Sequence, residues 1–436
     1  MKKNLVLLDE NSDECIFFCP ELIKFFKVEK NKMDEAEKLI EKMEYLDENK
    51  ETKCDKNSLK QLTIDVVDSC NLKCKYCYAL EGTYGKKVKF TSIEQMIAMY
   101  HDICKEYKFG VENICFFGGE PMLGFNTVKK FVIYVKKYNL KHKLTKTKFS
   151  MITNGTLIKD EDWDFFVNNN FVLTISLDGD KATNDSMRIY KNANDSVYDK
   201  VSSLMLKNKK NNLFVFCEAT LTPTFFDKYN GDINSYIKNF LDLGFDGFFP
   251  FVAEGELLHY TDEIMMKMSK FYEDFVRFWL SELTKIESKI YDKMPFIIVN
   301  LIRLLTTGEK SVLCGAGRNT VFCGTDGLFY KCQMYYKNGE QIRLSDLKPK
   351  IKYKPELKEC KGCISKNVCL FWCEGGAREF GNKNHVSKTR CIVQNAMTIT
   401  ICKWLINLSL DDTNILCDRL EKTNLKFGGC LWKWVW

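Results

Sequence analysis

The stretch LTIDVVDSCNLKCKYC, residues 62–77, joins a β-rich run directly to three closely spaced cysteines. Most later β-rich runs are likewise separated by amphipathic segments, which is the pattern of parallel βαβ units. In such folds the chemistry gathers where the strands end. The sequence therefore predicts an α/β sheet or barrel, with strands at LTIDVV (62–67), NICFFGG (113–119), KFSMIT (148–153), VLTISLDG (172–179), LFVFCEATLT (213–222) and DGFFPFV (246–252).

The chain divides into five predicted parts. A small α+β unit comes first, with strands at NLVLL and CIFF and helices at ELIKFF (21–26) and MDEAEKLIEKMEYL (33–46). Thr261 is expected to cap a helix running from Asp262 to about residue 286. The tail GGCLWKWVW (428–436) resembles a substrate peptide or a self-docking strand, but docking of an apolar end onto the body is the favoured interpretation. The predicted parts are 1–58, the barrel at 59–260, a helical bridge at 261–310, a cysteine-rich domain at 311–400, and a C-terminal helix and tail at 401–436.

The composition of the chain indicates which cellular compartment and which kinds of partner to expect. The 436 residues carry a net charge of +7, and neither a signal-peptide pattern nor a long apolar run is present. We therefore expect a cytoplasmic protein without a membrane span. The lysine-rich run 129–148 is interpreted as a solvated helix face rather than a nucleic-acid site. Cys104, Cys115, Cys217, Cys402 and Cys417 lie among apolar neighbours, and most are expected in the core.

Three cysteine patterns stand out among the 20 cysteines. Tetrahedral zinc is one interpretation of such clusters. The first pattern has only three thiols and no spare cysteine or histidine nearby, whereas a structural zinc site is normally closed by a fourth ligand. A cubane iron–sulfur cluster held by three thiolates leaves one iron open for another molecule. The patterns are Cys70, Cys74 and Cys77; Cys314 and Cys332 with Gly327 between them; and Cys360, Cys363, Cys369 and Cys373 followed by Cys391.

The first pattern resembles the CX3CXΦC loop of radical SAM enzymes, with Tyr76 in the aromatic position. In that family the open iron binds S-adenosylmethionine (SAM), and short motifs after later strands hold the rest of the cofactor. The GGEP, TNG and SLDG stretches and the N-D-x-x-R element of this chain occur in the same order. The resemblance therefore implies a partial (β/α)6 TIM-type barrel and SAM contacts from Tyr76, Gly118, Gly119, Glu120, Thr153, Asn154, Ser176, Asp178 and Arg188.

The segment 311–391 resembles the SPASM extension, which binds two auxiliary 4Fe–4S clusters. The family's ligation implies that Cys314, Cys332 and Cys373 hold the first of these clusters. Cys360, Cys363, Cys369 and Cys391 would hold the second. The first then lacks a fourth ligand, which is either Cys323 or an open position, and core packing is the favoured interpretation of Cys323. With the SAM-binding cluster, the chain would carry three 4Fe–4S clusters.

The resemblance implies peptide modification through a 5′-deoxyadenosyl radical, with the catalytic residues left unassigned. The first hypothesis is a maturase that installs a thioether or carbon–carbon cross-link in a ribosomal precursor peptide that contains cysteine. The second is an anaerobic sulfatase-maturing enzyme, but Gln333 stands where those relatives carry an aspartate base. A zinc-bearing scaffold is a third, non-enzymatic hypothesis. The expected partners are the peptide and a low-potential donor such as ferredoxin or flavodoxin. Residues 1–58 resemble a winged-helix peptide-recognition element, and a structural cap is the alternative.

Overall fold

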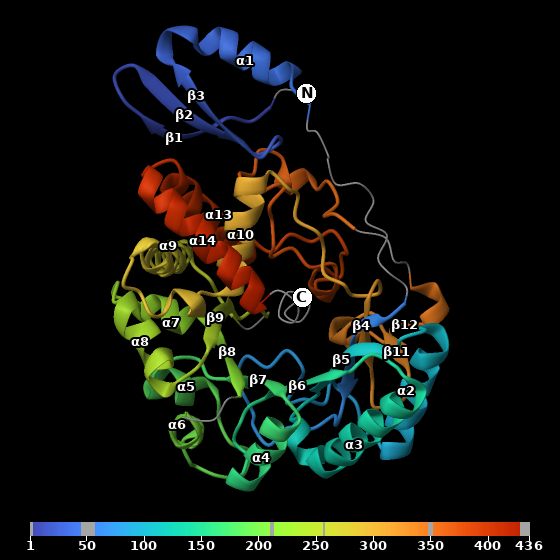
Figure 1. Ribbon diagram of the computed structural model, residues 1–436. Coiled ribbons are helices and arrows are strands. Elements are labelled where there is room, and N and C mark those ends of the chain that lie inside the picture. Colours follow the sequence, from blue (N-terminus) through green and yellow to red (C-terminus); the bar gives the residue numbers. More distant parts are fainter. Residues whose placement is uncertain (1–2, 45–56, 210–212, 256–257, 348–351, 428–436) are drawn as a thin grey trace.

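The computed structural model describes residues 3–44, 57–209, 213–255, 258–347 and 352–427. Its centre is a curved sheet of nine strands in the order β12-β11-β10-β4-β5-β6-β7-β8-β9 (Figure 1). The six strands from β4 to β9 pair in parallel with their sequence neighbours, as predicted. They are β4 (Leu59–Asp65), β5 (Val111–Phe117), β6 (Lys148–Thr153), β7 (Phe171–Ser176), β8 (Phe214–Leu221) and β9 (Gly247–Val252).

Helices follow each of these strands and lie on the outer side of the curved sheet (Figure 1). Ser92 and Gln95 close a capping box at the start of α2, so the first crossover helix begins at a defined residue. Six strand–helix units make a partial barrel, which confirms the predicted α/β fold class. The helices are α2 (Ile93–Glu106), α3 (Phe125–His142), α4 (Asp160–Asn168), α5 (Lys181–Met187), α6 (Val197–Asn208), α7 (Pro223–Lys228), α8 (Ile233–Leu243) and α9 (Asp262–Thr284).

The cysteine-rich part does not start as a separate domain. Strand β10 (Thr320–Cys323) pairs in parallel with β4, and β11 (Phe329–Tyr330) and β12 (Gln341–Ile342) continue the sheet in antiparallel fashion. The sequence analysis did not foresee this pairing, because it joins segments more than 250 residues apart. As a result, the chain around Cys314 and Cys332 lies beside the loop that follows β4.

Further helices pack beyond β9. Thr261 caps α9 by accepting a hydrogen bond from Ile264 N, which confirms the predicted helix start. Helix α13 (Lys388–Leu405) packs along α9 and crosses the predicted boundary at residue 400. The remaining helices are α10 (Phe296–Thr307), α11 (Gln333–Lys337), α12 (Glu374–Glu379) and α14 (Leu410–Phe427), with short 3-10 turns at Lys30–Lys32, Pro121–Gly124, Tyr291–Lys293, Leu344–Asp346 and Lys358–Cys360.

The N-terminal unit is a three-stranded antiparallel sheet and one helix, namely β1 (Val6–Glu10), β2 (Glu14–Cys19), β3 (Lys24–Glu29) and α1 (Met33–Lys42). The helix predicted at ELIKFF is wrong, because Lys24 begins strand β3. The apolar spacing at residues 22–26 imitates a helix, but Ile23 adopts a left-handed turn and Phe26 pairs with Phe17 of β2. The backbone hydrogen bonds of the hairpin outweigh the local pattern.

Three observations complete the description. None of the helices within the described residues is long and apolar enough to cross a membrane. The lysines of α3 lie on a surface helix, as predicted, with Lys130, Lys137 and Lys141 exposed. The tail 428–436, for which we predicted docking onto the body, lies outside the described residues.

Candidate active site

One cavity of about 550 Å³ opens at the carboxyl end of the parallel strands. Strand β8 shows how the sequence forms this cavity. Phe216, Glu218 and Thr220 line the cavity, whereas Cys217 and Ala219 between them are buried on the opposite face. Predicted site residues that line this cavity are Cys70, Cys74, Tyr76, Cys77, Gly118, Gly119, Thr153, Asn154, Ser176, Arg188, Cys314, Cys332 and Cys373. The fold thus brings together cysteines from all three patterns, which are far apart in the sequence.

The three-cysteine loop is held in place by hydrogen bonds to other segments of the chain. Lys73 N donates to Ile189 O at 2.7 Å, and Leu72 forms a bridge with Tyr190. Leu72 N and Asn154 Nδ2 both donate to Cys70 Sγ, at 3.3 and 3.6 Å. The loop therefore has a defined shape before anything binds to its thiols.

The electrostatics of this loop fit a cluster that brings its own positive charge. Burial is the main reason that the pKa of Cys70 rises to about 12 and that of Cys74 to about 11. Without a metal these thiols are protonated at neutral pH, and iron binding must displace the protons. Within the described residues, no three cysteine, histidine or acidic side chains lie close enough to hold one metal ion. A cubane suits this spacing better, because each thiolate binds a different iron.

Two glycines let the next loop approach the cysteine loop. A Cβ atom at Gly119 would lie 2.1 Å from Ser69 O, and one at Gly118 would lie 2.4 Å from Asp65 Oδ1. Gly118 also has a φ of +132°, which residues with side chains rarely adopt. Glycine is therefore required at both positions, as the GGEP motif implies.

Glu120 ties the ends of two strands together from within the protein. Its carboxylate accepts hydrogen bonds from Met122 N at 3.0 Å, Thr153 Oγ1 at 2.6 Å and Asn154 N at 2.8 Å. Complete burial outweighs these donors and raises the pKa of Glu120 to about 7. One predicted contact to SAM thus also shapes the wall around Thr153 and Asn154.

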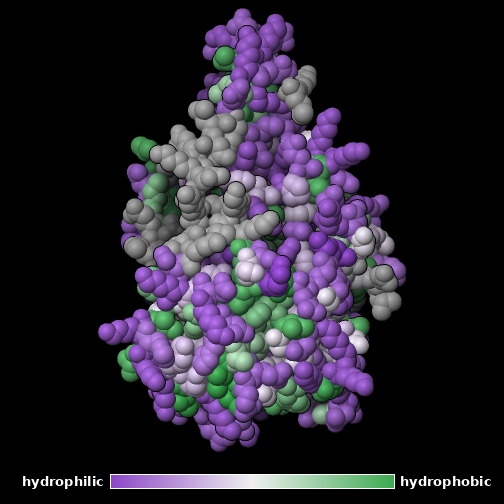
Figure 2. All heavy atoms as spheres, turned by 90° about the vertical axis from the view of Figure 1, so that its right-hand side faces the viewer, coloured by the Kyte–Doolittle hydropathy of each residue, from purple (hydrophilic) through white to green (hydrophobic). Residues whose placement is uncertain are grey.

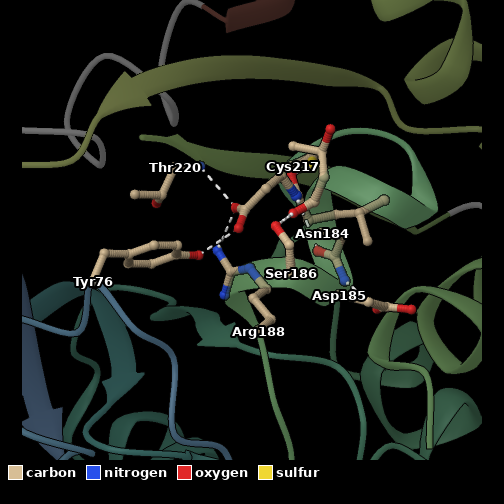
Figure 3. Close-up of polar contacts among 10 residues, drawn as sticks. Tyr76, Asn184, Asp185, Ser186, Arg188, Cys217 and Thr220 are labelled. Atoms are coloured by element: carbon tan, nitrogen blue, oxygen red, sulfur yellow. Dashed lines mark hydrogen bonds and ion pairs between the residues drawn. The ribbon is translucent and has the colours of Figure 1, made fainter. Parts of the chain in front are cut away.

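Asp178 is the centre of a second buried network, whose partners Tyr76, Arg188 and Thr220 are labelled in Figure 3. Its Oδ1 accepts from Arg188 at 2.9 Å and from Thr220 N at 2.8 Å, and its Oδ2 accepts from Tyr76 OH at 2.6 Å. The guanidinium of Arg188 also lies 5.5 Å from the centre of the Tyr76 ring. Asp178 therefore positions Arg188 and Tyr76, which line the cavity, and both of its oxygens are already engaged.

The later cysteines form two neighbouring groups. The thiols of Cys373 and Cys314 help raise the pKa of Cys332, for which burial is the main cause. Cys360, Cys363, Cys369 and Cys391 line a small cavity of about 30 Å³, and Cys373 lines both cavities. This grouping has the arrangement expected from the resemblance, while the ligand assignment remains a prediction.

Cys323 is fully buried on the other face of the sheet. In the pairing of β10 with β4, Cys323 lies opposite buried Ile64, while Phe322 lies opposite Thr63, and both Phe322 and Thr63 line the cavity. Core packing of Cys323 is thus confirmed. Core positions are also confirmed for Cys217 and Cys402, whereas Cys115 is buried but lines the main cavity, Cys104 is half-buried and Cys417 is exposed on α14.

The sequence analysis missed several ionisable residues that line the main cavity. Glu218 is one, and its position could have been found from the alternation of polar residues along β8. Glu254, just after β9, accepts from Thr389 at 2.8 Å and pairs with Arg390 at 2.7 Å. Arg390 precedes Cys391 and faces both cavities, so its place beside a predicted ligand was a usable signal.

The comparisons agree with this geometry. Residues 64–227 match the family model described as the radical SAM superfamily. The chain is 31% identical over 156 residues to a cysteine-type anaerobic sulfatase-maturating enzyme of Clostridium novyi (strain NT), covering 35% of this chain and 41% of that one. The match thus spans about two fifths of that curated relative.

Two solved structures share the fold over most of the chain. The structure of anSMEcpe with bound AdoMet matches with a TM-score of 0.66 at 20% identity, covering 82% of this chain and 98% of that one. Streptococcus suis SuiB bound to precursor peptide SuiA matches with a TM-score of 0.52 at 12% identity, covering 89% and 98%. The partial barrel of parallel strands and the three-cysteine loop after its first strand together define the class of protein. The chain contains a radical SAM domain, at residues 64–227.

Proposed function

We propose that this protein is a radical SAM peptide maturase that forms a thioether or carbon–carbon cross-link in a ribosomal precursor peptide. The observation that carries the proposal is the single cavity lined both by Cys70, Cys74 and Cys77 and by Cys332 and Cys373. A peptide segment in this cavity would lie between two iron–sulfur sites. Such a cross-link removes two hydrogen atoms in total, so an electron acceptor near the product is useful.

The residues present have defined tasks in this proposal. Cys70, Cys74 and Cys77 would hold the cluster, and bound SAM would supply a hydrogen-abstracting radical when reduced. Arg188, held by Asp178, offers a fixed positive charge to the bound cofactor, and Thr153 and Asn154 line the adjacent wall. The aromatic side chains that line the cavity exclude water from it.

The auxiliary sites would complete the redox path. Cys314, Cys332 and Cys373 would hold one cluster beside the cavity, and Cys360, Cys363, Cys369 and Cys391 a second one behind it. Three cubanes correspond to about twelve irons per chain. Iron and sulfide analysis of the anaerobically purified protein tests this number, and about four irons would restrict the proposal to the first site.

The proposed reaction is tested by anaerobic co-expression with short cysteine-containing peptides encoded beside the gene. We expect a peptide product that has lost two hydrogens per cross-link, together with 5′-deoxyadenosine. Tandem mass spectrometry then locates the bond, because fragmentation is suppressed between cross-linked residues. An unmodified peptide, in the presence of SAM cleavage, would contradict the cross-linking function.

Sulfatase maturation is the second candidate, and the similarity to the Clostridium novyi enzyme favours it. Against it, Gln333 lines the cavity at the position of the relatives' catalytic aspartate, and an amide cannot accept a proton there. The two candidates give different products from a cysteine peptide. Formylglycine exchanges the thiol sulfur for oxygen and reacts with a hydrazide probe, whereas a cross-link does neither.

The N-terminal unit is the proposed peptide-recognition part. It is joined to the cysteine-rich part by hydrogen bonds from Asn4 Nδ2 to Gly362 O at 2.9 Å and from Asn367 Nδ2 to Pro20 O at 3.0 Å. Gly362 lies between two predicted cluster ligands. Removing residues 1–44 should abolish binding of the precursor peptide while SAM cleavage remains, and retained peptide affinity would favour the structural-cap interpretation.

A further inference from the structure

The segment 69–90 has an unusual charge for a loop that carries three cysteines. It contains five lysines and one surface acid, Glu81, besides the cysteines themselves. Glu81 is already neutralised by Lys191, at 2.9 Å. The surface over the first cysteine site is therefore strongly positive.

Four of these lysines point into solvent. Lys73, Lys75, Lys87 and Lys89 are exposed, and none of their ammonium groups has a hydrogen bond or ion pair to the described residues. Lys86 differs, because it donates to Tyr336 O at 3.0 Å and stays against the protein. The four exposed lysines, which we call the lysine rim, are free to meet an external anion.

Apolar side chains of the same segment are also exposed. Leu80 and Val88 are each 58% exposed, and Phe90 is 52% exposed. Phe90 reaches the chain at Gly124, next to Leu123, which is also exposed. Single hydrophobic residues are common on this protein, as the green side chains in Figure 2 show, so exposure alone would mean little. Their place on the same segment as four unpaired, exposed lysines is what distinguishes this group.

The loop is a thin wall with a fixed shape. Ala79, Gly82 and Tyr84 face the main cavity. Leu80, which lies between them, and Lys87, which follows them, face solvent. Leu80, Glu81 and Tyr84 all have positive φ angles, a strained conformation that residues with side chains adopt only when the surroundings enforce it. One layer of chain thus separates the first cysteine site from the exterior.

We propose that the lysine rim and the apolar residues Leu80, Val88 and Phe90 form the docking surface for an acidic electron-transfer protein. The inference rests on the proposed function, since SAM cleavage in that chemistry needs an electron from an external donor. Positive charge and exposed apolar area match a partner that is acidic around its redox group. The thin wall places that group near Cys70, Cys74 and Cys77, and the pre-shaped loop limits the entropy lost on docking.

The test compares two reductants of the holoenzyme. In the variant K87E/K89E, which leaves the cysteine motif intact, a purified flavodoxin should reach half-maximal 5′-deoxyadenosine formation only at about threefold higher concentration, since such contacts act through charge. Dithionite, which needs no docking surface, should drive the same rate as in the wild type. The matched control K137E/K141E changes the net charge equally on α3, and it should behave as the wild type.

Leu80→Asp gives an independent test, because Leu80 lies outside the cysteine motif and its side chain faces solvent. It should also weaken flavodoxin dependence while dithionite-driven activity and iron content stay unchanged. Unchanged flavodoxin dependence in both variants would overturn the proposal, as would an equal fall in the α3 control. Loss of binding to anionic phospholipid vesicles with intact flavodoxin dependence would assign the surface to a membrane. Failure of the proposed function has a different signature, namely SAM cleavage without peptide modification.

Discussion

The two main cysteine groups differ in their surroundings. Cys70, Cys74 and Cys77 lie on the wall of a cavity of about 550 Å³, beside Arg188 and Asn154. The group of Cys360, Cys363, Cys369 and Cys391 encloses only about 30 Å³, and Lys354 Nζ reaches Cys360 Sγ at 3.3 Å. Three thiols facing a large cavity leave space for ligand and substrate, whereas four around a small one do not. This difference fits the proposal that the first group binds a cluster together with other molecules and that the second holds only a cluster.

The sharpest way to break this comparison is to remove one cysteine from each group. Cys74→Ala should abolish SAM cleavage to the background level, because the open cluster cannot form with two thiolates. Cys363→Ala should lose about four irons and keep SAM cleavage, while peptide modification falls. Iron content and 5′-deoxyadenosine release measure both effects. Turnover by Cys74→Ala would refute the assignment of the first site.

A second comparison concerns the buried charges beside each group. Asp178→Asn leaves Arg188 buried without its ionic partner, so we expect a loss of about 3–5 kcal/mol in the free energy of unfolding. Glu254→Gln weakens the more accessible pair with Arg390 and should cost about 1 kcal/mol. Denaturant unfolding of both variants measures the difference. Equal losses would show that the two networks do not differ as the geometry indicates.

The sequence predicted what depends on local pattern and spacing. The six parallel strands follow from alternating apolar runs, and the cysteine groups follow from spacing within short segments. The pairing of β10 with β4 was missed, because a four-residue strand carries little signal and its partner lies far away in the chain. The hydrogen bonds from Arg188 and Tyr76 to the Asp178 carboxylate were missed for a similar reason, because they are tertiary contacts. The sequence motif identifies Asp178 but does not show which side chains its oxygens contact.

Glu218 provides a subtler test of the open cavity. It lines the cavity beside Arg188, and its carboxylate makes no hydrogen bond or ion pair to the described part of the chain. Glu218→Gln should therefore leave the free energy of unfolding unchanged and raise the KM of a bound ligand by about tenfold, the effect of one charged hydrogen bond. Separate KM values for SAM and peptide show which ligand it contacts. A stability loss without any change in KM would make Glu218 a structural residue.

The smallest expected effect is the pH dependence that Glu120 contributes behind the cavity wall. Burial raises its pKa from 4.5 to about 7, so the folded state holds this proton more tightly than the unfolded state. Its contribution to stability is complete below pH 4.5 and is lost as the pH rises through 7, with about 1 kcal/mol of that loss between pH 6 and 8. Glu120→Gln removes the titrating group, so the variant's unfolding free energy should fall less over that interval under anaerobic conditions. A wild-type stability that rises from pH 6 to 8 relative to the variant would mean that the hydrogen bonds from Met122, Thr153 and Asn154 outweigh burial, and that Glu120 is a carboxylate at neutral pH.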